Sequence, residues 1–134
     1  MTPESSACLH RLLEGNIHEF TLTETTRRAV DELYGFIENL NFEIANNPTA
    51  TPHIFMIVDA TVGLPPLNYA FKHTKPLVAK YSRQKATVAL ISPDSFLLKT
   101  IAVILRSITP VRFFKSDERA QALAWLQEQA AAAR

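Results

Sequence analysis

The chain has 134 residues, of which 47% are hydrophobic and 20% charged, and its formal net charge is +1. This size and balance predict one globular domain, residues 1–134, whose ends at 1–6 and 129–134 we expect to fray. No apolar run approaches the roughly 18 residues that span a bilayer, and no signal-peptide pattern opens the chain, so a cytoplasmic location is expected. The lone Cys8 excludes an internal disulfide, and no cysteine–histidine cluster indicates a zinc site.

Charge is distributed unevenly along the chain. Residues 1–59 hold nine acidic and three basic residues, whereas residues 60–115 hold nine basic residues and one acidic residue. Such a split can orient a partner or a second copy of the chain, or it can fold into an ordinary mixed surface. Five of the basic residues fall between positions 72 and 85: Lys72, Lys75, Lys80, Arg83 and Lys85.

The first predicted element is a β-hairpin. Gly15 and Asn16 tolerate the positive φ angles of a two-residue turn. After that turn, His18, Phe20 and Leu22 share one face of a strand. The segment before the turn, "CLHRLLE", suits a strand or a short helix.

A long helix is predicted next. Thr25 or Thr26 can cap its start, and Asn46, Asn47 and Pro48 end it. Its apolar residues fall three or four apart and form one stripe, made of Val30, Leu33, Ile37, Leu40 and Ile44.

Three apolar runs follow, "HIFMIVDA", "ATVALIS" and "VRFF", beginning near residues 53, 86 and 111. Helical patterns separate them, and this βαβ spacing predicts parallel strands joined by right-handed crossovers. The first two runs are apolar on both faces, which is typical of central strands covered by helices.

Helices are predicted between these runs and after the last of them. The helix from about 67 to 82 contains Pro76, which should break or bend it near residues 74–75. A second helix, 93–108, starts at a Ser-Pro-Asp cap. In the final helix Ser116 is the expected cap, and the residues expected to pack are Ala120, Leu123, Ala124 and Trp125.

The predicted fold is therefore α/β, a mixed sheet parallel at its centre, in the order β-β-α-β-α-β-α-β-α. This order resembles the STAS domain of bacterial anti-sigma-factor antagonists (SpoIIAA-like), and more closely the small STAS/SEC14-like proteins. The resemblance covers roughly residues 8–128 and is carried by the opening hairpin with its long helix, "HIFMIVDA", "ATVALISP" and "ITPVRFFKSDERAQALAWL".

The resemblance implies regulation by protein–protein contact. Antagonists of this family carry an Asp-Ser-Ser/Thr-Gly loop whose hydroxyl is phosphorylated to switch partner binding. The corresponding loop here, "DATVGLPP", has Asp59 and Gly63, but Thr61 is its only hydroxyl. Thr61 lies upstream of two prolines that remove amide donors from the next helix, so we predict no phospho-switch.

Candidate site residues are few. Asp59 ends a central strand, where open α/β sheets place ligands, although it can equally hold the loop after it. The basic stretch with Lys72, Lys75, Lys80 and Arg83 fits either a solvated helix face or a site for an anionic ligand, lipid headgroup or acidic protein. An isoelectric point near 7.9 argues against nucleic acid.

No motif for catalysis, nucleotide binding or metal binding is present, so no enzyme activity and no cofactor are expected. Two functions stay open: a regulatory or scaffold module that binds a protein or forms a homodimer, and a carrier of a small apolar or anionic, lipid-like ligand. For a dimer, the apolar contact residues would be Phe36, Phe42 and Tyr69.

Overall fold

The computed structural model describes residues 6–93 and 110–133. These residues form one five-stranded sheet whose spatial order follows the chain, β1-β2-β3-β4-β5. The first two strands are antiparallel, and each later strand is parallel to the one before it. The mixed sheet with a parallel centre is thereby confirmed. The strands are β1 (Cys8–Leu13), β2 (Ile17–Leu22), β3 (His53–Asp59), β4 (Lys85–Ser92) and β5 (Val111–Lys115).

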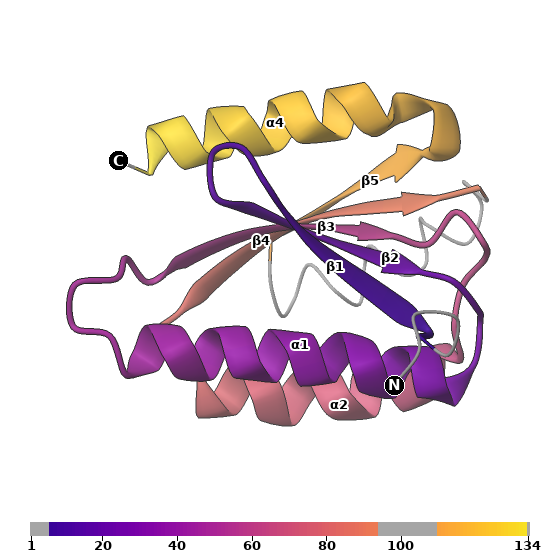
Figure 1. Ribbon diagram of the computed structural model, residues 1–134, viewed down its shortest axis with the longest axis horizontal. Helices are drawn as coiled ribbons and strands as arrows, with labels where there is room; N and C mark the ends of the chain where they lie inside the picture. Colours follow the sequence, from indigo (N-terminus) through magenta and orange to yellow (C-terminus); the bar gives the residue numbers. More distant parts are fainter. Residues whose placement is uncertain (1–5, 94–109, 134) are drawn as a thin grey trace.

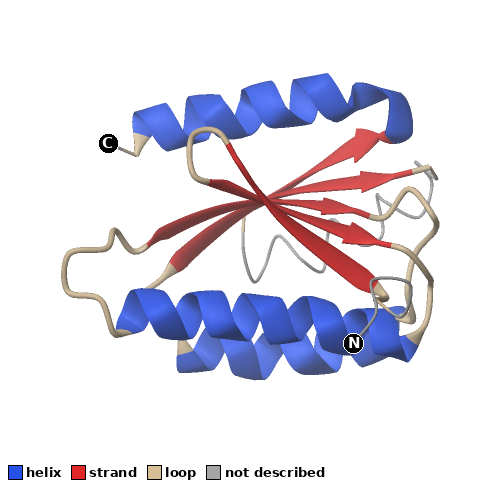
Figure 2. Cartoon of the chain, viewed as in Figure 1, coloured by secondary structure: helices blue, strands red, loops and turns tan. Residues whose placement is uncertain are grey.

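Three described helices cover the two faces of this sheet (Figures 1 and 2). α1 (Arg27–Ala45) and α2 (Leu67–Lys80) lie side by side on one face, and α4 (Arg119–Ala132) lies on the other. α1 connects β2 to β3, and α2 connects β3 to β4, so the two crossovers step across the sheet in the same direction. Crossovers of the same hand then place both helices on the same face, as is seen for α1 and α2. The helix predicted at 93–108 lies almost entirely outside the described residues.

The hairpin forms as its turn residues predict. Gly15 and Asn16 have φ angles of 84° and 64°, a region that an L-residue other than Asn or Asp seldom adopts. Leu13 pairs with Ile17, so the connection has three residues, 14–16, rather than two. The segment before the turn is a strand, since each residue from Cys8 to Leu13 pairs with a residue of β2.

α1 confirms the predicted stripe and selects one of the two possible caps. The Thr26 side chain accepts a hydrogen bond from the Ala29 amide, at 3.3 Å. Val30, Leu33 and Ile37 are buried; Leu33 and Ile37 pack in one cluster with residues of β2 and β3, and Leu40 and Ile44 pack at its edge.

α2 does not break near residues 74–75, where the sequence predicted either a break or a bend. The helix continues from Leu67 to Lys80 with Pro76 inside it. Contacts to α1 flank the proline: Thr74 bonds the Tyr34 hydroxyl on one side, and Lys80 bonds Glu38 on the other. These tertiary contacts hold the helix together where its local sequence favours a break.

The start and the packed face of α4 also differ from prediction. Ser116 begins a short 3₁₀ turn, η2 (Ser116–Glu118), and Glu118 accepts the Lys115 amide at 2.8 Å, so Ser116 is not the cap of α4. Ala120 and Ala124 are exposed. The buried stripe, four residues apart, is Ala122, Leu126 and Ala130, with Leu123 and Trp125 partly buried beside it.

Candidate functional site

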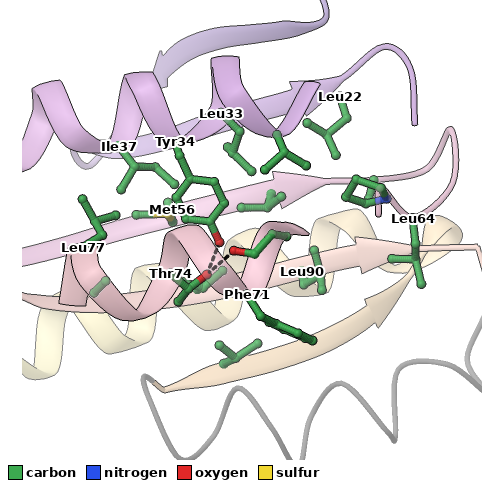
Figure 3. Close-up of a pocket in the computed structure, with 18 of the residues that line it drawn as sticks. Leu22, Leu33, Tyr34, Ile37, Met56, Leu64, Phe71, Thr74, Leu77 and Leu90 are labelled. Atoms are coloured by element: carbon green, nitrogen blue, oxygen red, sulfur yellow. Dashed lines mark hydrogen bonds between the residues drawn. The ribbon is translucent and has the colours of Figure 1, made fainter. Parts of the chain in front are cut away.

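An apolar cavity of about 160 Å³ lies between the α1–α2 pair and the sheet (Figure 3). Its wall draws on β2, both helices, β3, β4, β5 and the loop before α2. Apart from two hydroxyl groups, the described side chains around it are hydrocarbon or thioether, among them Leu33, Ile37, Met56, Phe71, Leu77 and Leu90.

The local sequence explains why apolar groups meet here. Alternate residues of β4, namely Ala86, Val88 and Leu90, face the cavity, as the two-residue period of a strand requires. Ala70 contributes from α2. The short side chains of Ala70 and Ala86 leave volume that a leucine or isoleucine would fill.

Tyr34 and Thr74 carry the two hydroxyls that line the cavity, and they come from α1 and α2 (Figure 3). The hydroxyls are hydrogen-bonded to each other, and Thr74 Oγ1 also donates to the Ala70 carbonyl at 3.0 Å. Thr74 is buried. Burial raises the pKa of Tyr34, only partly offset by its bond to Thr74, so the phenol is neutral at physiological pH.

A second, open groove of about 360 Å³ runs outside the cavity between α1 and α2, and Tyr34 and Leu77 line both hollows. Opposite charges meet in it. Glu38 accepts Lys80 Nζ at 2.6 Å, and this hydrogen bond raises the pKa of Lys80. Asp31 accepts the Tyr69 hydroxyl at 2.5 Å. The polar side chains of the groove are thus largely paired with groups of the same protein.

Asp59 and Thr61 do come together, but as a loop turn. Asp59 Oδ1 accepts the Thr61 amide at 3.0 Å and the Thr61 hydroxyl at 2.5 Å. This geometry matches the alternative in which Asp59 holds the loop after its strand. Both groups lie outside the cavity wall.

The basic residues do not join Asp59. Lys72 and Lys75 are exposed on α2, Arg83 is exposed in the turn after it, and Lys80 is bound to Glu38. α2 returns the chain to the amino end of β4, where Lys85 pairs with His53. Arg83 is therefore about a strand length, roughly 20 Å, from the carboxyl end that holds Asp59.

The surroundings of Cys8, His10 and His18 indicate structural rather than reactive roles. Burial raises the pKa of Cys8 to about 12, so its thiol stays protonated. His10 Nε2 and His18 Nδ1 are 3.0 Å apart on the hairpin. Within residues 6–93 and 110–133, no three His, Cys, Asp or Glu side chains are placed to share a metal ion.

Sequence reasoning missed Tyr34 and Thr74. Their signal was present, since each is a hydroxyl residue set at helical spacing within an otherwise apolar stripe. What the sequence could not show is that the two stripes face each other across forty residues of chain.

Comparisons with protein-family models, with curated proteins and with solved structures found no match. Among the described helices, none combines the length and hydropathy needed to traverse a bilayer.

Proposed function

We propose that this protein binds a compact apolar ligand in the cavity beneath α1 and α2, and that it acts by binding rather than by catalysis. The observation that supports the proposal is the cavity itself, about 160 Å³ of partly open apolar volume between the α1–α2 pair and the sheet. Protein interiors are normally packed as densely as organic crystals. An engineered apolar cavity of roughly 150 Å³ in another protein stays dry and binds benzene or xenon.

The proposal takes the carrier alternative that the sequence left open and narrows it to an apolar molecule. An anionic ligand is less well supported, because the cavity wall has no basic side chain among its described residues. The STAS-like order of elements and the cytoplasmic location stay part of the proposal.

Toluene is a suitable probe, because it is apolar and close in size to benzene. At ten times its dissociation constant it should raise the melting temperature by about 5 °C, since a ligand that binds only the native state adds to the free energy of unfolding. Differential scanning fluorimetry and chemical-shift changes around Met56 would measure binding.

Two alanines of α2 give a matched pair of variants. Ala70 lines the cavity, whereas Ala79 is exposed on the same helix. Ala70→Leu should abolish the toluene shift by filling the volume, and Ala79→Leu should keep it. Equal shifts in both variants, or no shift in the unmodified protein, would refute the proposed site.

A second candidate is the protein-binding module, acting first on another copy of the same chain. It is supported by exposed apolar side chains, with Leu12 57% and Phe42 59% exposed, and by β1, which is an edge strand of the sheet. Glu38 and Lys80, from the acidic and basic segments, pair within one chain, which weakens the electrostatic part of this idea. Sedimentation at micromolar concentration in low and high salt tests it, and a monomer in both would reject it.

A further inference from the structure

The direction of the hydrogen bonds at the cavity wall follows from counting protons. A hydroxyl has one proton to donate and two lone pairs to accept with. Thr74 Oγ1 donates its proton to the Ala70 carbonyl, so toward Tyr34 it is an acceptor. The Tyr34 hydroxyl is consequently the donor in the Tyr34–Thr74 bond.

Tyr34 is then left with acceptor capacity only. Its proton is committed to Thr74, while its oxygen keeps a lone pair for a further partner. The other described side chains of the wall, apart from Thr74, offer no oxygen or nitrogen. On the pocket side of this half-buried hydroxyl, the remaining lone pair can accept a hydrogen bond only from a group that brings a proton.

We propose that Tyr34 is the specificity-determining residue of the cavity, and that it selects a compact aromatic or aliphatic molecule carrying one O–H or N–H donor, of the phenol or indole type. This inference rests on the proposed function, because it names the chemistry of the ligand in the same cavity. A ligand with only acceptor atoms, such as an ether, would place its oxygen against the Tyr34 oxygen with no proton between them. The volume limits the ligand to about one aromatic ring.

Three probes of similar size separate donor chemistry from simple apolar filling: phenol, toluene and anisole. Their affinities would be measured by calorimetry or NMR titration on the full chain and on two variants. Tyr34→Phe removes the acceptor and keeps the ring. It should weaken phenol about tenfold, because the phenol proton loses its partner, should leave toluene unchanged within twofold, and should not weaken anisole, whose oxygen no longer faces the Tyr34 oxygen.

Thr74→Val is the reciprocal variant. It keeps the shape of the side chain but removes the acceptor for the Tyr34 proton. Tyr34 can then donate into the cavity, so anisole should bind several-fold more tightly while toluene is unchanged. A variant that binds none of the three probes would be checked for folding by circular dichroism.

The outcomes separate the two claims. If none of the probes binds the unmodified protein, the proposed function fails and the inference fails with it. If toluene binds but phenol affinity is the same in the unmodified protein and in Tyr34→Phe, the ligand site stands and the role of Tyr34 is wrong. Loss of phenol affinity alone in Tyr34→Phe, with gain of anisole affinity in Thr74→Val, supports both.

Discussion

On the α4 face of the sheet, Ile17, Ile57 and Leu126 are fully enclosed, and small residues such as Ala89 fit closely between larger ones. On the α1–α2 face of the same strands, the described side chains leave a cavity of about 160 Å³. Helices cover both faces (Figure 2), so the two faces differ in the volume that their side chains leave unfilled. Closely packed cores are the general rule, so the looser face is the one that calls for a functional explanation.

Polar groups differ between the two faces as well. The α4 face buries Glu19, whose carboxylate meets Arg11 at 2.8 Å and also pairs with Arg119. This arrangement connects β1, β2 and α4. The α1–α2 face instead buries the hydroxyl of Thr74 beside empty apolar volume. Both polar contacts join elements, since Thr74 on α2 bonds Tyr34 on α1, but only the one on the α1–α2 face also lines an apolar pocket that a ligand could enter.

The largest predicted effect comes from enlarging one side chain on each face of the same strand. Ala86 and Ala89 lie three residues apart in β4 and therefore face opposite sides. Ala89→Val should destabilise the protein by about 1–3 kcal/mol, because added methyl groups do not fit a close-packed core. Ala86→Val should be neutral or stabilise by up to about 1 kcal/mol, because it fills cavity volume.

Urea unfolding of both variants and the unmodified protein measures the difference. Because both substitutions are alanine to valine in the same strand, each variant is the control for the other. Equal destabilisation by the two substitutions would mean that the α1–α2 face is packed as closely as the α4 face. The apolar cavity would then lose its support, and the proposed ligand site with it.

Much of this fold was predictable because local chemistry and tertiary structure agree. Gly15-Asn16 allows only a few turn conformations, the α1 stripe fits a single helix face, and runs that are apolar on both sides belong at the centre of a parallel sheet. Prediction failed where a distant contact overrides the local pattern. Pro76 remains inside α2 while contacts on both sides of it bind that helix to α1.

The site was harder to predict than the fold. Asp59 has the expected position at the end of a strand, yet its carboxylate is occupied by its own loop. The cavity depends on the absence of atoms between two elements, which no single segment encodes. Glu19 shows the same limit, since one of the two arginines that pair with its buried carboxylate, Arg119, lies one hundred residues later in the chain.

The smallest predicted effect is a pH dependence on the hairpin, at the edge of the looser face. Burial first, and then neighbouring His10, lower the pKa of His18, while Glu43 acts in the opposite direction. The folded state therefore binds this proton less readily than the unfolded chain, whose histidines titrate near pH 6.5. The stabilising contribution is complete above about pH 6.5 and is lost as the pH falls from there through the lower, folded-state pKa.

His18→Gln removes this titration and should flatten the fall in the free energy of unfolding between pH 7.5 and 5.5. His53→Gln, on β3 and away from the His10–His18 pair, is the control and should keep the acid-side fall of the unmodified protein. The effect is small because His18 is only partly buried, so it needs full urea curves at each pH. An unchanged slope in His18→Gln would assign the acid sensitivity to other groups and leave the contrast between the two faces to packing alone.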